Sequence, residues 1–200
     1  MRQVSWNISD TDKSIKAQQL KRICEESVEN GKKVLVFSFF INTLEQAGKV
    51  LDCKVFGPIN GSVSPTKRQQ LIDEFSACEG GAVLISQIQA GGTGLNIQAA
   101  SVIVFCEPQI KPSLETQAIS RAYRMGQTNT VLVYRLLCED TIDERIMQIL
   151  DDKQELFDNF AEKSVSGAES LNVGEKEYNS IIEAEAERIR RQEEAEASEG

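Results

Sequence analysis

Histidine is absent from the 200-residue sequence. Without an imidazole, the chain cannot by itself build a histidine metal site, a Ser-His-Asp triad or a Cys-His dyad. Cysteine is scarce as well. The five cysteines lie far apart in the sequence and form no C-x-x-C pair. An odd, scattered set of this kind favours neither a zinc site nor a disulfide framework. We therefore expect buried free thiols in a reducing compartment, and no metal bound by this chain.

Long apolar runs are missing too. No segment approaches the roughly 18 consecutive apolar residues of a membrane span. The first residues, Met1-Arg2-Gln3-Val4, are not followed by the apolar core of a signal peptide. We therefore expect no membrane contact and no secretion. With 40% hydrophobic and 26% charged residues, the composition is typical of a globular protein.

Basic residues are outnumbered by acidic ones, and the formal net charge is −9. Of this charge, −5 falls on residues 163–200, so residues 1–162 carry only −4. A broad basic face for nucleic acid is thus not visible, and any phosphate binding has to use local clusters and backbone donors. We expect residues 163–200 to form an acidic, partly helical or flexible tail. Its narrow apolar stripe, which includes Tyr178 and Ile182, fits either a solvated helix or one that docks on a partner.

Predicted strands and helices alternate along the rest of the chain. Helices are expected at residues 13–29, 42–51, 113–123 and from 141 onward. Another helix is expected to begin at Ser64-Pro65, because serine can cap the amino end of a helix and proline suits its first turn. A buried strand is expected at residues 33–40 and a short strand at 54–56. Strands buried on both faces are expected at residues 82–86, 102–105 and 131–137. This alternation predicts an α/β fold, a three-layer parallel sheet with helices on both faces.

The loop after the predicted strand 82–86 has three glycines in four positions, Gly91, Gly92 and Gly94. Such a loop lets backbone N–H groups approach a phosphate, although a tight turn packed against a helix explains it equally well. It is not a Walker A loop, since neither Gly-Lys pair in the chain is followed by serine or threonine. It also lacks the third glycine of a dinucleotide fingerprint, which disfavours a nucleotide-dependent oxidoreductase.

A second unusual segment is the predicted helix that contains Gln117, Arg121 and Arg124. Positions i, i+4 and i+7 place the amide and the two guanidiniums on one helix face. Two neighbouring arginines repel each other unless an anion compensates them, and a triphosphate would do so. Local pairing with Glu107 or Glu115, or simple exposure to solvent, remains an alternative.

Four ordered motifs resemble the second RecA-like lobe of the Swi/Snf-type, helicase-like ATPases of superfamily two. They are Val34-Leu35-Val36-Phe37-Ser38, then Asn60-Gly61-Ser62 with Lys67-Arg68-Gln69, then Ile85-Ser86 through Asn96, and finally Gln117 through Gln127. The similarity runs from about residue 13 to 160. Its strongest element is Arg-x-x-Arg-x-Gly-Gln in the last motif, from Arg121 to Gln127.

The resemblance implies a lobe spanning residues 1–162, with a brace helix at about 141–160, that closes over ATP and Mg²⁺ held mainly by a first lobe. It implies arginine fingers at Arg121 and Arg124, with Gly92, Gly94 and Gln117 also near the nucleotide. Contacts to nucleic acid, expected to be double-stranded DNA, are implied for Ser38, Lys67, Arg68, Thr93 and Asn96. The isolated chain would not hydrolyse ATP. The alternative is a non-catalytic module that keeps the fold and binds nucleic acid or protein.

Three positions depart from the usual family pattern. Tyr123 stands where a histidine is frequent between the two arginines, and Asn60 replaces the usual aspartate of the D-G-S segment. Residues 109–112, Gln-Ile-Lys-Pro, stand where the family often has Trp-Asn-Pro, so the tryptophan is missing. These variants are closer to compact bacterial members than to nuclear remodellers, which predicts a cytoplasmic protein.

Overall fold

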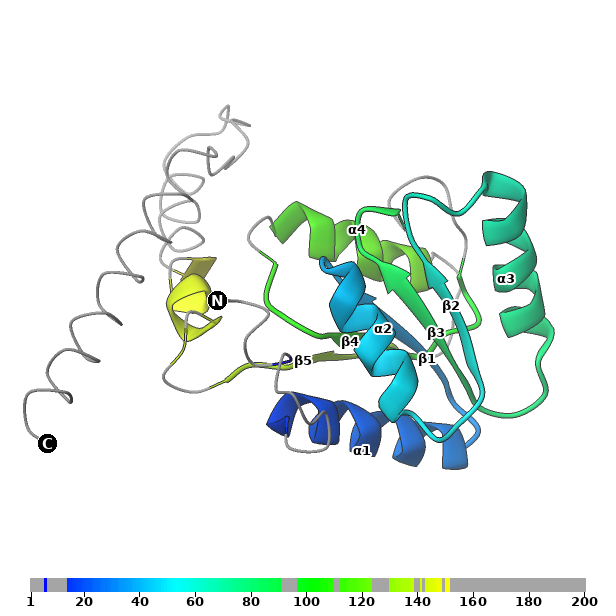
Figure 1. Ribbon diagram of the computed structural model, residues 1–200, viewed down its shortest axis with the longest axis horizontal. Coiled ribbons are helices and arrows are strands. Elements are labelled where there is room, and N and C mark those ends of the chain that lie inside the picture. Colours follow the sequence, from blue (N-terminus) through cyan, green and yellow to red (C-terminus); the bar gives the residue numbers. More distant parts are fainter. Residues whose placement is uncertain are drawn as a thin grey trace, which may run out of the picture. The chain divides into compact units, whose positions relative to one another are not determined.

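The computed structural model describes Trp6 and residues 14–90, 97–109, 112–123, 130–138, 141, 143–148 and 150–151. The chain divides into two compact units, residues 1–147 and 148–200. All the labelled helices and strands belong to the first unit (Figure 1). The predicted border between residues 162 and 163, and the tail beyond it, lie outside the described residues.

Five parallel strands form the sheet of the first unit. They are β1 (Lys33–Ser38), β2 (Val55–Ile59), β3 (Ala82–Gln87), β4 (Val102–Phe105) and β5 (Leu132–Arg135). Their order across the sheet is β2-β3-β1-β4-β5, and all four neighbouring pairs are parallel. The predicted parallel sheet is confirmed, and its strands begin and end within three residues of the predicted positions.

Helix α1 (Ile15–Glu29) precedes the first strand. Helices α2 (Ile41–Val50), α3 (Pro65–Ala77) and α4 (Pro112–Ala122) lie between successive strands. Ser64 caps α3 as expected, since its side chain accepts a hydrogen bond from the Lys67 N–H. Residues 143–148, 150 and 151 are also helical, and the rest of the predicted brace helix lies outside the described residues. In the described parts of the chain, no helix has the length and apolar character needed to cross a membrane.

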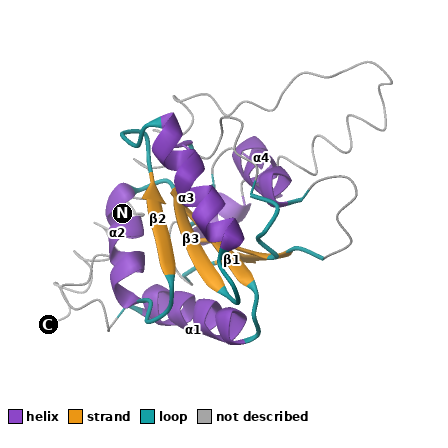
Figure 2. Ribbon diagram, turned by 90° about the vertical axis from the view of Figure 1, so that its right-hand side faces the viewer, coloured by secondary structure: helices purple, strands orange, loops and turns teal. Residues whose placement is uncertain are grey.

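Each face of the sheet has its own apolar core, because successive side chains of a strand point to opposite faces. On β1, Val34 and Val36 pack with residues of α1 and α2, whereas Leu35 and Phe37 pack with residues of α3 and α4. Two helices therefore cover each face, as the views in Figures 1 and 2 allow the reader to follow. This is the predicted three-layer arrangement.

The two edge strands differ from the sequence prediction in instructive ways. Strand β5 was expected to be buried on both faces, yet Leu132 and Tyr134 are about 40% exposed, because they face an open pocket beside α1. Strand β2 extends through Gly57-Pro58, beyond the predicted end at residue 56. An edge strand tolerates proline, and Gly57 is required there: its φ is +100°, and a Cβ would lie 2.5 Å from the Ile85 carbonyl oxygen.

One carbonyl group at the end of β4 collects contacts from distant segments. The Cys106 oxygen accepts hydrogen bonds from Trp6 Nε1 and from Lys16 Nζ, each at 3.3 Å. Lys16 also forms an ion pair with Asp143, and both side chains are buried. The start of α1 and the helical segment after β5 are thereby fixed to the same strand end.

Candidate nucleotide and nucleic-acid interface

The candidate site lies at the carboxyl edge of the sheet, where the loops after the parallel strands converge. Residues 39–40 follow β1, residues 60–64 follow β2, residues 88–101 follow β3 and residues 106–111 follow β4. Three of the four segments singled out in the sequence end at, or lie in, one of these loops, whereas the fourth, residues 117–127, begins within α4. The fold thus brings the first three motifs to the carboxyl edge.

Both described ends of the glycine-rich loop are held by arginine residues. The Ile97 N–H, just after the loop, donates to the Arg121 carbonyl oxygen at 3.1 Å. The Ala90 carbonyl, just before it, accepts a weaker bond of 3.5 Å from the Arg68 guanidinium. Residues 91–96, which include the predicted contacts Gly92, Thr93, Gly94 and Asn96, lie outside the described residues. The loop nevertheless starts and ends beside α3 and α4.

Arg121 lies in the last turn of α4 and is half-buried, and Gln117 is exposed one turn earlier. Their helical spacing is as predicted, whereas Arg124 lies outside the described residues. The sequence analysis left open that the arginines pair locally with Glu107 or Glu115. The Glu115 carboxylate accepts a 2.6 Å hydrogen bond from Arg135 Nε, and the Glu107 carboxylate accepts bonds from Ser38 and Phe39.

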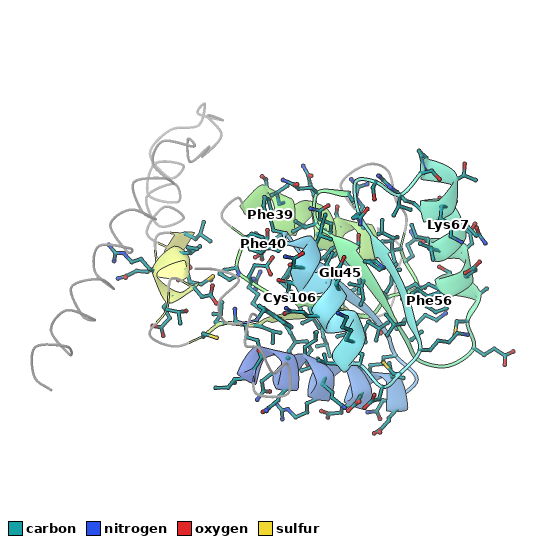
Figure 3. All side chains as sticks on the ribbon, viewed as in Figure 1. Phe39, Phe40, Glu45, Phe56, Lys67 and Cys106 are labelled. Atoms are coloured by element: carbon teal, nitrogen blue, oxygen red, sulfur yellow. The ribbon has the colours of Figure 1, made fainter. Side chains whose placement is uncertain are left out.

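Arg68 and Lys67 differ sharply, although they are adjacent on α3. The Arg68 guanidinium donates to the carbonyls of Val63 at 2.8 Å and Gly61 at 3.2 Å, in addition to Ala90. Lys67 is exposed, and its Nζ donates to Gln70 Oε1 at 3.1 Å (Figure 3). Arg68 therefore organises the loop after β2, while Lys67 presents its charge to solvent.

Ser38, predicted to lie near bound nucleic acid, is fully buried at the end of β1. Its hydroxyl donates to the Glu107 carboxylate, with 3.0 Å to Oε2, and accepts the Phe40 N–H at 3.0 Å. Both bonds turn the chain out of the sheet, which is why β1 ends at Ser38 rather than at the predicted residue 40. The structure gives this hydroxyl an internal role, and the exposed groups at this point are Phe39 and Ile41.

A buried polar network was missed by the sequence analysis. Glu107 and Gln109 follow β4, Glu115 lies in the first turn of α4, and all three are less than 8% exposed. Gln109 Nε2 donates to Glu107 Oε1 at 3.2 Å, and the Gln109 N–H donates to Glu115 Oε1 at 3.2 Å. The available signal was a glutamate and a glutamine placed directly after an apolar strand, where a polar residue needs a partner.

The Glu107 carboxylate affects the neighbouring thiol of Cys106. Burial, and secondly the neighbouring Glu107 carboxylate, raise the pKa of the Cys106 thiol well above its ordinary value of 9.0. Among the described residues, no group of three or more acidic or cysteine side chains is arranged to hold a metal ion. The described part of the edge offers guanidinium, amide and backbone donors, which suit phosphate groups.

Comparison with known proteins identifies the family. Residues 15–126 match the family model described as the helicase conserved C-terminal domain. The chain belongs to this family. The match covers more than half of the chain and includes α1 through α4, the glycine-rich loop and both predicted arginine fingers. This helicase C-terminal domain is of the SNF2 type, as its relatives show.

Two relatives illustrate the similarity. A protein of Mycoplasma pneumoniae named an uncharacterized ATP-dependent helicase is 32% identical over 80% of this chain and 16% of its own length. The ATP-dependent helicase fft3 of Schizosaccharomyces pombe is 36% identical over 69% of this chain and 15% of its own length. The helicase C-terminal domain thus spans about one sixth of the relatives it matches.

A solved structure supports the same assignment. The C-terminal part of the Fun30 ATPase domain is 33% identical and superposes with a TM-score of 0.65, covering 70% of this chain and 47% of that one. The RecA-like, parallel-sheet fold predicted for the helicase C-terminal domain is therefore shown. Being the C-terminal domain of ATP-dependent helicases, it forms part of an ATPase.

Proposed function

We propose that this domain is the second motor lobe of a DNA-dependent ATPase that translocates along double-stranded DNA. ATP and Mg²⁺ would be held mainly by a first lobe of the same parent chain. One observation carries the proposal: the last turn of α4, which bears Arg121, is hydrogen-bonded to Ile97, just after the glycine-rich loop. This loop follows the carboxyl end of β3, where open parallel sheets bind their ligands.

Arg121 and Arg124 are proposed as arginine fingers. When bound, ATP supplies the phosphoryl group whose negative charge builds up during transfer. A guanidinium aimed at that charge is worth about 10³ to 10⁵ in rate. Gly92 and Gly94 would offer backbone N–H groups, and Gln117, exposed one turn before Arg121, would support the arginines.

Nucleic-acid contacts are proposed for the same edge. Lys67 is exposed and positively charged, and Thr93 and Asn96 belong to the loop between the two tethered ends. Arg68 and Ser38 would act by shaping the loops that carry these contacts, because their polar groups are engaged with protein atoms. Such backbone-directed contacts would let the lobe track one strand without reading its sequence.

A two-lobed protein tests this proposal. The chain is joined behind a first lobe that carries a Walker lysine, and ATP hydrolysis is measured with and without duplex DNA. DNA-stimulated hydrolysis is expected, whereas the isolated chain is expected to be inactive. Arg121→Ala and Arg124→Ala should each lower kcat by at least about 10³-fold while DNA affinity changes little.

Arg22→Ala is the matched control, because Arg22 is an α1 arginine whose guanidinium bonds only to Gln19 among the contacts seen here. It should leave turnover unchanged. Full turnover in both finger variants would refute the assignment. DNA binding by the two-lobed protein without any ATP consumption would instead favour the non-catalytic module. We further propose a cytoplasmic location, which localisation of a tagged parent protein would test.

A further inference from the structure

Gln109 joins two buried carboxylates that belong to different parts of the site. Its side-chain amide donates to Glu107, with Nε2 at 3.0 Å from the carbonyl oxygen and 3.2 Å from Oε1. Its backbone N–H donates to Glu115 Oε1 at 3.2 Å. Gln109 is 1% exposed, so these bonds are made away from water. Buried hydrogen bonds to charged groups are costly to break.

The Glu107 side of this bridge leads to the turn between β1 and α2. Glu107 Oε1 accepts the Phe39 N–H at 2.6 Å, and its carboxylate also accepts the Ser38 hydroxyl. The Phe39 carbonyl is held in turn by Gln87 Nε2 at 3.0 Å. Phe39 and Phe40 stack edge to face, and Figure 3 shows them at the amino end of α2, well apart from Lys67. Glu107 therefore fixes an aromatic turn that projects at the carboxyl edge.

The Glu115 side of the bridge leads to α4. Glu115 lies in the first turn of this helix, and its second oxygen accepts Arg135 Nε from the end of β5. Arg121 lies in the last turn of the same helix. Since a three-turn helix moves as a unit, a displacement of Glu115 is transmitted to Arg121.

We propose that Gln109 is a positioning residue that couples the β1–α2 turn to the orientation of α4. The proposal rests on the proposed function, in which Ser38, at the start of the turn, shapes the loops that carry the nucleic-acid contacts and α4 carries the arginine finger Arg121. A neutral amide suits this position because it donates to one carboxylate without adding charge. A third acidic side chain beside Glu107 and Glu115 would be repelled by both. Binding at the turn thus reaches the arginine finger through one buried residue, whose side chain contacts Glu107 and whose backbone N–H contacts Glu115.

The first test measures ATP hydrolysis by the two-lobed protein carrying Gln109→Met, which keeps the length of the side chain and removes the amide. The rate without DNA is expected within about twofold of the parent, because mutation of a coupling residue changes mainly the coupling. The stimulation by DNA should fall about 2- to 30-fold. The KM for ATP should not change. Equal losses with and without DNA, or full stimulation, would overturn the proposal.

Gln69→Met is the matched control. Gln69 is an exposed glutamine on α3 whose Nε2 also bonds to a carboxylate, Asp73 Oδ1 at 2.8 Å. It should leave stimulation intact. If Gln109→Met lowers the melting temperature below that of the assay, Gln109→Asn serves instead, because it keeps the amide but withdraws it from Glu107. The double variant, which combines the Gln109 substitution with Glu107→Gln, should lose less DNA stimulation than the sum of the losses in the two single variants.

The second test uses the 200-residue chain alone and needs no ATPase. Backbone amide resonances of the ¹⁵N-labelled chain are compared between the parent and Gln109→Met. Shifts are expected both at Phe39 and along α4 as far as Arg121. Shifts confined to the neighbours of residue 109 would overturn the coupling. If the unsubstituted two-lobed protein fails to hydrolyse ATP, the proposed function fails, and this comparison still decides whether Gln109 links the two segments.

Discussion

Lys16 of α1 forms a buried ion pair with Asp143, with only 2% and 3% of the two side chains exposed. The Asp143 Oδ2 atom also accepts the Cys138 N–H at 3.4 Å, and Lys16 Nζ reaches the Cys106 carbonyl. The pair therefore connects the first helix, the end of β4 and the segment after β5. A charge in such a position depends on its partner, because neither side chain can turn to solvent.

Removing one partner of this pair should be more damaging than removing both. Asp143→Ala is expected to lower the free energy of unfolding by about 3–5 kcal/mol, because it leaves the Lys16 ammonium buried without its counter-charge. The double variant Lys16→Met with Asp143→Leu should recover much of that loss. Urea denaturation monitored by circular dichroism measures both. A double variant no more stable than Asp143→Ala would contradict this account.

Adjacent basic residues on α3 should behave differently in a stability assay. Arg68→Ala removes donors from the Val63, Gly61 and Ala90 carbonyls and is expected to cost about 1–3 kcal/mol of unfolding free energy. Lys67→Ala should stay within about 0.5 kcal/mol, because Lys67 is exposed. In the two-lobed protein, Lys67→Ala should instead reduce the salt dependence of DNA binding by about one counterion. Equal losses of stability in Arg68→Ala and Lys67→Ala would contradict the different roles given to these two residues.

All five cysteines are free, but only Cys24 and Cys106 are buried. The expectation of buried thiols is therefore wrong for Cys53, Cys78 and Cys138. These three residues lie just beyond the ends of α2, α3 and β5, where side chains reach the surface.

The buried thiols predict a loss of stability at alkaline pH. Burial first, and Cys53 second, raise the pKa of the Cys24 thiol far above its ordinary value of 9.0. Above pH 9 the unfolded chain loses this proton while the folded chain keeps it. The contribution to stability is therefore complete below pH 9 and declines as the pH rises, by about 1.4 kcal/mol per unit for one thiol. Urea denaturation at pH 8 to 10 should give Cys24→Ala a shallower decline than the parent, and identical slopes would refute the prediction.

The fold was predictable because its signals are local. Apolar runs at β1, β3 and β4 and the serine cap of α3 follow rules that operate within a few residues. The errors arose where a neighbour in space decides the outcome. Gly57-Pro58 belongs to β2 because the residues on either side of it, Phe56 and Ile59, pair with β3, and Leu132 is exposed because it lines an open pocket beside α1.

The site was only partly predictable for the same reason. The spacing of Gln117 and Arg121 on α4 follows from the helical repeat. The internal roles of Ser38 and Arg68 do not, because each depends on partners distant in sequence: Glu107 is 69 residues from Ser38, and Ala90 is 22 residues from Arg68. The family resemblance implied nucleic-acid contacts for both residues, whereas packing directs these two polar groups toward the protein.

The sheet itself limits how such a domain can move. Alternate residues of β1 belong to opposite cores, so the α1–α2 layer and the α3–α4 layer pack against the two faces of the same strands. If one layer slid over the sheet, cavities would open on both faces, and a close-packed interior resists the formation of cavities. We therefore expect no hinge within the sheet: during a motor cycle it would travel as a rigid body, and the bending would fall to its loops and to the connection with the neighbouring lobe.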